Sequence, residues 1–429
     1  MTLFQKIGNI FRADFVKNSA TLLFANVLSQ AITLFFYPLL TRLYSPSDFG
    51  LFNLFLSIGG IITLFGTANY HYAIVLPPKE KKAIDCFHIG LFINIIIFIV
   101  CLFGLFFTSS IASLFDTPIL AKYLYLLPFF VFLSAFWNLL NYWFTRKKQF
   151  KNIGSYQLIQ SVGTSSLKYG FGLLGYLGGG LIIGTVVGQL LAVCSSIALA
   201  WRKGVKKLFS VDKYGIKVVA KEYANFPKYS LPHSVVNTLG GSMPILLLTP
   251  FFLIGDIGYF GMALALAFRP INIISSSLNQ VFYQTTAVRV NHDLEILPFF
   301  KRFISRTALI LVPSFILLYF ILPWLTAFLL GHGWSETGEY IRLMLPWLLM
   351  SAMVAPISYL ADIFEKQQIG LLFEVASILM RLSGLLVGIY FKSFYLAIAL
   401  YCVASTLIIA LQLVWYWGII TSYENRIKS

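Results

Sequence analysis

The sequence has little charge. Of its 429 residues only 11% are Asp, Glu, Lys or Arg, less than half of the roughly 25% typical of soluble domains. Hydrophobic residues make up 58%, and 41 residues are Phe. No water-soluble core hides that much apolar surface. The composition therefore excludes a large soluble enzyme, a disordered chain and a secreted disulfide scaffold, and it indicates a polytopic membrane protein.

Motifs for several kinds of chemistry are also missing. There is no GxxxxGK[ST] loop for ATP hydrolysis, no HExxH pair and no CxxC pair. The four cysteines lie inside or beside apolar runs, which is typical of small buried residues, and the five histidines are scattered. The sequence also lacks the large outer loop or acidic cluster that a membrane polymerase or glycosyltransferase needs. We therefore expect a transporter rather than an enzyme, with no metal and no cofactor.

Twelve segments carry about 20 or more mostly apolar residues, enough to cross ~30 Å of hydrocarbon. They predict an all-α membrane protein with twelve transmembrane helices. The predicted spans are 19–40, 49–68, 84–107, 123–142, 153–174, 177–201, 229–252, 257–282, 303–329, 340–362, 370–390 and 395–417.

The basic residues predict the orientation. With the N-terminus inside, 25 lysines and arginines fall in cytoplasmic segments and only four in outer loops. This asymmetry places both termini in the cytoplasm. The net charge of +16 is then a topology signal facing anionic lipid headgroups, so it does not indicate a nucleic-acid partner.

The same pattern divides the chain into two lobes of six spans each. Residues 1–18 form an amphipathic N-terminal segment, and 418–429 form a cytoplasmic tail. The N-lobe covers 19–201 and the C-lobe covers 229–417. Between them, the basic cytoplasmic linker 202–228 is expected to lie on the membrane surface.

The two lobes resemble each other in sequence. A shift of 208 residues brings the outer turn after the first span onto the outer turn after the seventh. Because each copy holds an even number of spans, both copies have the same orientation, as in parallel repeats related by a pseudo-two-fold axis along the membrane normal. The aligned residues include Asp48, Gly50 and Phe52, which meet Asp256, Gly258 and Phe260.

Polar residues follow one helical face in four spans. Two interpretations stay open: the residues bond neighbouring helices, or they face a shared polar cavity. Their position on the first two spans of both lobes favours the cavity. The stripes are Asn26, Gln30, Thr33 and Tyr37; Asn53, Ser57 and Gly60; Ser230, Ser234, Asn237 and Gly241; and Arg269, Asn272, Ser276 and Asn279.

Arg269 is the most informative charged residue. It lies ~16 Å along its helix from Gly258, close to the membrane midplane, and Pro270 after it predicts a kink. An arginine at that depth costs roughly 2.5–3.5 kcal/mol on insertion scales, so a functional role is expected. Guanidinium suits phosphate because it forms bidentate, charge-assisted hydrogen bonds. We therefore expect a central cationic cavity and an anionic substrate.

The other charged candidates each have an alternative. Lys168 either faces the substrate or extends past Tyr169 to the outer surface, and Arg42 at the outer mouth either guides substrate or anchors to headgroups. Arg381 either binds substrate or pairs with Glu374, which lies two turns away. Glu374 and Asp362 are candidates for carrying a coupling proton, unless consumption of the product drives transport. The predicted substrate-binding residues are Arg269, Arg42, Lys168, Arg381, Asn26, Gln30, Asn237, Asn272 and Asn279.

Two sequence blocks resemble a known family. Residues 40–52, LTRLYSPSDFGLF, are similar to the first outer turn of the polysaccharide-repeat-unit (O-antigen) flippases of the multidrug/oligosaccharidyl-lipid/polysaccharide (MOP) exporter superfamily. Residues 70–77, YHYAIVLP, resemble a second block, in which family members often show an Arg-Tyr-Glu run before a similar Ala-Ile-Val-Leu-Pro. Here Asn69 replaces that Arg and His71 replaces the Glu.

The resemblance implies a V-shaped, MATE-like arrangement with spans one, two, seven and eight lining a central cavity. It also implies alternating access that moves an undecaprenyl-diphosphate-linked oligosaccharide to the outer leaflet of a bacterial inner membrane. Membrane lipids, a polymerase and a chain-length regulator are then the expected partners. Two alternatives remain: a multidrug or metabolite exporter of the same superfamily, and a repeat-unit polymerase.

Overall fold

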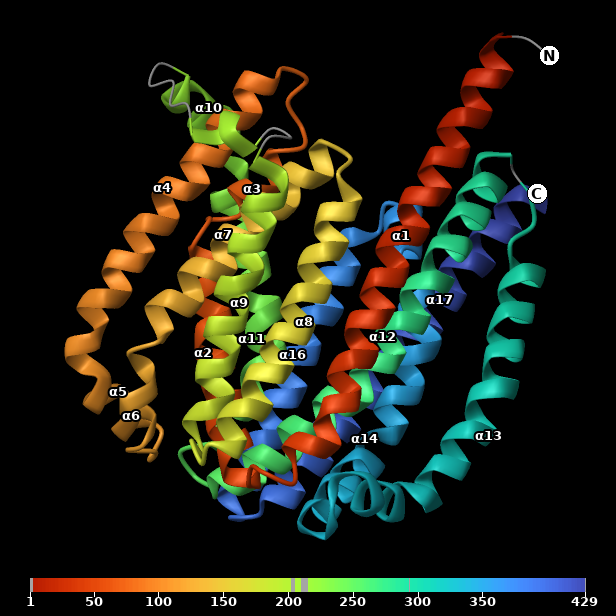
Figure 1. The fold of residues 1–429 in the computed structure, drawn as a ribbon. Coiled ribbons are helices and arrows are strands. Elements are labelled where there is room, and N and C mark those ends of the chain that lie inside the picture. Colours follow the sequence, from red (N-terminus) through yellow and green to blue (C-terminus); the bar gives the residue numbers. More distant parts are fainter. Residues whose placement is uncertain (1–2, 202–204, 210–214, 293, 429) are drawn as a thin grey trace. The chain divides into compact units, whose positions relative to one another are not determined.

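The computed structural model describes residues 3–201, 205–209, 215–292 and 294–428. Within these ranges, side chains are described except those of 3–20, 207, 209, 272–274, 276–281, 283–284, 287, 291 and 428. Every regular element in the described ranges is helical (Figure 1). This confirms the predicted all-α class.

The chain forms two compact units, Met1–Pro250 and Phe251–Ser429. Unit 1 contains α1 (Leu3–Leu40), α2 (Pro46–Phe65), α3 (Tyr70–Ala73), α4 (Glu80–Gly104), α5 (Thr108–Leu114), α6 (Leu120–Leu124), α7 (Leu127–Arg146), α8 (Phe150–Leu173), α9 (Gly179–Ala200), α10 (Ile216–Glu222) and α11 (Leu231–Leu248). Unit 2 contains α12 (Ile254–Asn291), α13 (Leu297–Leu330), α14 (Ser335–Val354), α15 (Leu360–Ile363), α16 (Gln367–Tyr390) and α17 (Phe394–Lys428).

A long helix stands at each of the twelve predicted spans. In the described part of the chain, ten helical segments have the length and hydropathy needed to cross a membrane. The other two predicted spans correspond to α8 and α11, which are richer in polar residues and glycine. The protein is therefore a multi-pass membrane protein, and the count of twelve is consistent with its helices.

The internal repeat is also seen in the positions at which the helices begin and end. Helices α1 and α11 end at Leu40 and Leu248, and α2 and α12 begin at Pro46 and Ile254. Each pair is 208 residues apart, the same shift that aligns the two outer turns. Helices α7 and α14 are related by this shift at both of their ends. The two halves thus repeat helix boundaries as well as sequence.

Local sequence explains how α2 begins. Ser45 is its N-cap, and Asp48 Oδ2 accepts hydrogen bonds from the backbone N–H and the hydroxyl of Ser45, both at 2.8 Å. Pro46 occupies the first helical position, where its missing N–H costs nothing. This capping box accounts for the Ser-Pro-Ser-Asp run in the first resemblance block.

The first helix is longer than predicted. Helix α1 is continuous from Leu3 to Leu40, where the sequence indicated a separate segment over 1–18. The side chains of 3–20 lie outside the description, so the amphipathic character of 1–18 stays a prediction.

The linker packs on unit 1 instead of lying only on the membrane surface. Val219 of α10 is buried in the same core as Phe87 and Trp143. Lys82 Nζ at the start of α4 lies 2.8 Å from the Glu222 carboxylate. Figure 1 shows α10 beside the start of α4. The apolar face of the linker therefore has a protein partner, which its basic composition did not indicate.

The boundary between the compact units also differs from the predicted lobe boundary. Helix α11 opens the predicted C-lobe, yet it packs against α2 and belongs to unit 1. Packing between two helices does not decide which repeat each belongs to. The division into lobes at 19–201 and 229–417 therefore stays a prediction.

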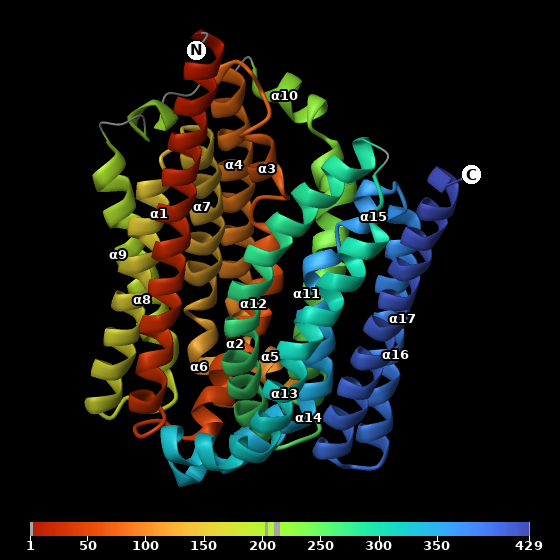
Figure 2. The same cartoon turned by 90° about the vertical axis from the view of Figure 1, so that its right-hand side faces the viewer.

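In unit 2, α14 is the central helix, with α12, α13 and α17 packed on it. Figure 2 shows α16 and α17 side by side. Their contact depends on Gly388, because a Cβ there would overlap the backbone of Ala397. One end of the unit is closed by an aromatic core that includes Phe282, Phe300 and Tyr416.

Candidate functional site

The loop between α2 and α4 is hydrogen-bonded to one of the polar stripes. Asn69 has a left-handed backbone conformation (φ +61°), which Asn tolerates better than most residues. Its side-chain amide donates hydrogen bonds to Ser230 Oγ at 3.0 Å and to Ser234 Oγ at 2.9 Å. These two serines of the stripe therefore hold the loop against the start of α11. We call Asn69, Ser230 and Ser234 the inner latch.

His71 lies two residues after Asn69 and is buried. Its Nδ1 is 2.6 Å from Thr67 Oγ1, and its ring contacts the rings of Tyr72 and Tyr142, with centroids 4.2 and 5.0 Å away. It stands outside the membrane-spanning segments, and burial lowers the pKa of His71 to about 4. The imidazole is therefore neutral at pH 7 and serves as a packed polar core residue rather than as a cation.

Arg146 at the end of α7 holds the rest of this loop. Its guanidinium donates to the carbonyl oxygens of Ile74, Val75 and Pro78 at 3.2–3.3 Å. Three carbonyls on one guanidinium fix the backbone of the Ala-Ile-Val-Leu-Pro block. This contact explains why the second resemblance block forms an ordered turn between two spans.

Away from the latch, the polar stripes border open space. Asn237 and Gly241 of α11 are exposed, although both lie within a predicted span. A Cβ added at Gly241, or at Gly60 on the α2 stripe, would meet no atom within 4 Å. Residues that join helices are closely surrounded, so Asn237, Gly241 and Gly60 do not serve to join helices.

The α1 stripe is accessible in the same way. Ala25 and Ser29 are buried, and Ala25 faces Gly154 of α8. Asn26, about 100° further round the helix, is exposed, and Gln30 is half-buried. The predicted polar face is therefore separate from the face that packs on α8.

The two predicted substrate-binding cations of unit 1, Lys168 and Arg42, have different environments in the structure. Lys168 is half-buried and turned toward α2, with its ammonium 4.4 Å from the centre of the Phe52 ring. Its carbonyl accepts a hydrogen bond from Tyr44 Oη at 2.7 Å. Arg42 is exposed in the turn after α1. The two residues are separate in their contacts, and only Arg42 is freely accessible.

Arg381 packs within unit 2. Its Nε donates to Ser405 Oγ at 2.9 Å, and its guanidinium lies 5.6 Å from the Trp347 ring centre and 5.5 Å from that of Tyr401. These contacts join α14, α16 and α17. They favour a packing role for Arg381, which the sequence offered as one of two alternatives but with Glu374 as the partner.

The remaining predicted residues are spread over unit 2. Arg269 is half-buried within α12, which continues through Pro270. The side chains of Asn272 and Asn279 lie outside the described residues. Glu374 is half-buried on α16, and Asp362 is exposed on α15. The structure thus packs α2 against α11 and leaves the roles of these five residues as predictions.

Comparison with known proteins identifies the fold. Residues 39–339 match a family described as polysaccharide biosynthesis protein. An inward-facing multidrug resistance MATE family transporter of the MOP superfamily is 14% identical, with TM-score 0.66 over 93% of this chain and 99% of the transporter. The lipid II flippase MurJ in its inward closed conformation is 15% identical, with TM-score 0.71 over 95% of this chain and 90% of MurJ.

A eukaryotic MATE transporter shares the fold more distantly, at 14% identity and TM-score 0.52 over 96% of this chain and all of the transporter. No curated protein matches the sequence. At such identities the likeness establishes the fold and leaves substrate open. It confirms the predicted MATE-like fold class.

Proposed function

Because the chain belongs to the polysaccharide biosynthesis protein family and has the fold of the MOP superfamily, we propose that it is a flippase for lipid-linked oligosaccharides. Its substrate is an undecaprenyl-diphosphate-linked repeat unit of an O-antigen or a similar surface polysaccharide. The observation that carries the proposal is the family match over 39–339. The fold alone does not separate this function from drug export, since both a MATE transporter and MurJ share it.

The polar stripes supply a route for the sugar. Asn26 and Asn237 are exposed amides on otherwise apolar helices, and Gly60 and Gly241 leave room beside them. Amides donate and accept hydrogen bonds, as sugar hydroxyls do, so these side chains replace water around a moving glycan. Gln30, Asn272 and Asn279, which belong to the polar stripes predicted from the sequence, are assigned the same role.

Arg269 is assigned the phosphate end of the substrate. A guanidinium at midplane depth offsets the cost of carrying a diphosphate through an apolar barrier. Arg42, on the exposed outer turn, guides the diphosphate at release, and Lys168 adds positive charge on the α2 side of α8. Glu374 and Asp362 stay the candidates for proton coupling.

The proposed location is a bacterial inner membrane with both termini in the cytoplasm, as the basic residues predict. The flippase then acts by alternating access, taking the repeat unit from the cytoplasmic leaflet and releasing it to the outer leaflet. A polymerase and a chain-length regulator use the product there.

The test is a strain in which this chain is the only flippase. Deletion traps lipid-linked repeat units where impermeant sugar-oxidising or lectin probes on spheroplasts do not reach them. Arg269→Ala abolishes surface glycan while the protein still inserts, and Arg269→Lys is milder because it keeps the charge but not the bidentate geometry. Lys122→Ala, which removes an exposed cation on α6, is the matched control.

Normal surface glycan in an inserted Arg269→Ala strain would remove Arg269 from the mechanism. Free probe access to the repeat units in the deletion strain would remove the flippase function itself. Single repeat units capped on the outer lipid would indicate the polymerase alternative. Sensitivity to cationic drugs with normal glycan would indicate the exporter alternative.

A further inference from the structure

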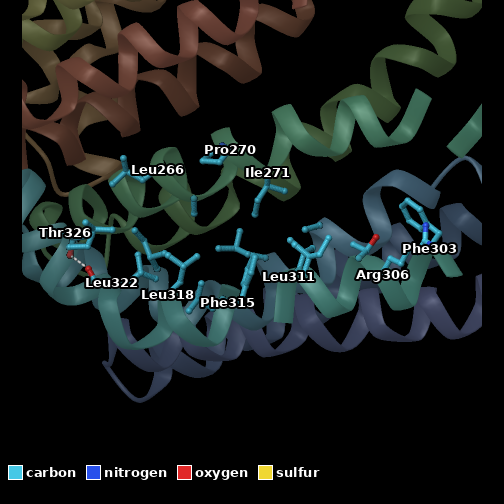
Figure 3. A pocket seen from close by; sticks show the side chains of 18 of the residues that line it. Leu266, Pro270, Ile271, Phe303, Arg306, Leu311, Phe315, Leu318, Leu322 and Thr326 are labelled. Carbon is cyan, nitrogen blue, oxygen red and sulfur yellow. Dashed lines mark hydrogen bonds between the residues drawn. The ribbon is translucent and has the colours of Figure 1, made fainter. Parts of the chain in front are cut away.

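Unit 2 contains a long apolar groove. Helices α12 and α13 each pack on α14 but make few contacts with each other, so a channel runs between them with α14 as its floor. Its volume is about 830 Å³. Figure 3 shows Leu318 and Phe315 of α13 opposite Leu266 and Pro270 of α12.

The wall of the groove offers nothing polar over most of its length. The Thr326 hydroxyl donates to the Leu322 carbonyl at 2.9 Å, so it is satisfied within its own helix. Arg269 is not among the lining residues, since it projects from another side of α12 than Leu266 and Pro270. The groove is therefore separate from the polar stripe on α12 and suits a hydrocarbon.

Two arginines stand at one end of this groove. Arg302 and Arg306 both line it, near the start of α13, and their i, i+4 spacing puts them on one helical face. Figure 3 shows Arg306 at this end of the groove. Neither has a hydrogen bond, ion pair or ring contact to any residue the structure describes. Two like charges side by side at the mouth of an apolar channel favour an anion between them.

The neighbouring charged groups are already engaged. Arg289 Nη1 donates to the Glu295 carbonyl at 2.8 Å, and the Lys301 ammonium lies 5.5 Å from the Trp417 ring centre. Glu424 Oε2 accepts from the backbone N–H of Ile296 at 3.1 Å. The contrast singles out Arg302 and Arg306 as the guanidinium groups available to a ligand.

The length of the groove exceeds what one phospholipid chain covers. On α13 its lining extends from Arg302 to Leu329, about 40 Å at 1.5 Å per residue. The hydrocarbon core is about 30 Å thick, so one leaflet accounts for only about 15 Å. A phospholipid acyl chain fills less than half of this length, whereas a long polyprenyl chain fills all of it.

We infer that this groove binds the polyprenyl chain of the substrate, and that Arg302 and Arg306 hold its diphosphate at the end of the groove before the diphosphate passes to Arg269 during translocation. The inference deepens the proposed function and rests on it, because the family and the proposed cargo supply the polyprenyl lipid. The groove holds the lipid tail along unit 2, apart from the polar stripe that receives the sugar. It defines a lipid-binding site that the sequence stripes did not indicate.

The test is photocrosslinking of the purified full-length protein with a diazirine-bearing polyprenyl diphosphate that carries no sugar. A diazirine phosphatidylglycerol of ordinary acyl length is the comparison probe. Labelled peptides are expected from the facing sides of α12 and α13. Excess unlabelled polyprenyl diphosphate should remove the label, and excess phospholipid should not.

Two kinds of variant sharpen the test. Leu318→Trp fills the groove, and Leu317→Trp, one residue earlier and 60% exposed, is its matched control. Arg302→Gln with Arg306→Gln removes the anion contacts without changing the core. Losing charge-assisted hydrogen bonds predicts a fall in labelling of about tenfold or more in the double variant. Leu318→Trp should lose labelling, and Leu317→Trp should keep it.

Equal labelling by both probes, labelling outside the groove, or full labelling of the double variant would overturn the inference. These results do not depend on translocation of sugar, which the glycan assay measures separately. If the groove does not bind the lipid, the glycan assay can therefore still give a normal result. Failure of the proposed function appears as accessible repeat units in the deletion strain, whatever the crosslinking shows.

Discussion

The side-chain amide of Asn69 donates a hydrogen bond to Ser234 Oγ at 2.9 Å, across 165 residues of sequence. It joins the loop after α2 to the first turns of α11, and it is reinforced by the bond to Ser230. Asn69 also holds a left-handed conformation. Its side chain and its backbone therefore both contribute to the inner latch, and substitutions can separate the two.

Asn69→Ala is expected to destabilise the purified protein more than Asn69→Gly. Both lose hydrogen bonds worth about 0.5–1.5 kcal/mol each, but Ala adds a left-handed penalty of about 1–2 kcal/mol that Gly avoids. Thermal unfolding monitored by size-exclusion chromatography measures the difference. Equal melting temperatures for the two variants would show that the backbone conformation carries no cost.

His71 predicts a dependence of stability on pH. Its folded pKa of about 4 lies below the ordinary 6.5, because burial disfavours the imidazolium. The unfolded chain therefore binds the proton first as pH falls. The contribution of His71 to the free energy of unfolding is fully present above pH 6.5. It falls as the pH drops from 6.5 to 4 and does not change further below pH 4.

The expected loss is about 2 kcal/mol between pH 8 and pH 5. His71→Asn should flatten that part of the profile, measured as melting temperature against pH. His332→Asn, at an exposed histidine before α14, should keep the wild-type slope. The same slope in His71→Asn as in the wild type would assign the pH dependence to another group.

The close contact between α16 and α17 at Gly388 leaves no room for a larger side chain at this position. A methyl group at this position would overlap the backbone of Ala397, which moves only if the two helices separate. Gly388→Ala is expected to cost about 1–3 kcal/mol through overpacking. Gly370→Ala on the same helix, where a Cβ meets Ala361 Cβ at 3.9 Å, is the control and should be close to neutral. Similar melting temperatures for both variants would contradict the packing argument.

Sequence patterning predicted the fold well because the apolar spans and the repeat are local or additive signals. Hydropathy predicted twelve spans, a long helix stands at each of them, and the turn at Ser45 and Asp48 carries its own capping box. A shift of 208 residues anticipated the matched ends of α1 and α11. None of these features depends on knowing which helix lies beside which.

The site was less predictable because its contacts join distant parts of the chain. The sequence marked Asn69 as a departure from the family block, but only the folded structure shows that Ser230 and Ser234 are its partners. The sequence offered Glu374, on the same helix, as one possible partner of Arg381, whereas the structure shows its hydrogen bond to Ser405 on α17. Arg302 and Arg306 resembled ordinary cytoplasmic cations, because only packing shows that they stand at the end of a groove.

Glu424 anchors the start of α13 through two hydrogen bonds to its backbone. This carboxylate is 3% exposed, and Oε2 accepts from the backbone N–H groups of Ile296 at 3.1 Å and Leu297 at 3.3 Å, where the helix begins. Glu424→Ala leaves buried donors without their acceptor and should cost about 1–3 kcal/mol. Glu424→Gln keeps an acceptor oxygen and loses the favourable charge at the helix N-terminus, so it should cost less.

The control is Asn425→Ala, the exposed neighbour on α17. Melting temperatures should fall in the order Asn425→Ala, Glu424→Gln, Glu424→Ala. Because the start of α13 positions Arg302 and Arg306, Glu424→Ala should also weaken labelling of the groove by the polyprenyl probe, while Asn425→Ala leaves it unchanged. A loss of stability in Glu424→Ala with full groove labelling would show that the cap holds the helix without setting the position of the two arginines.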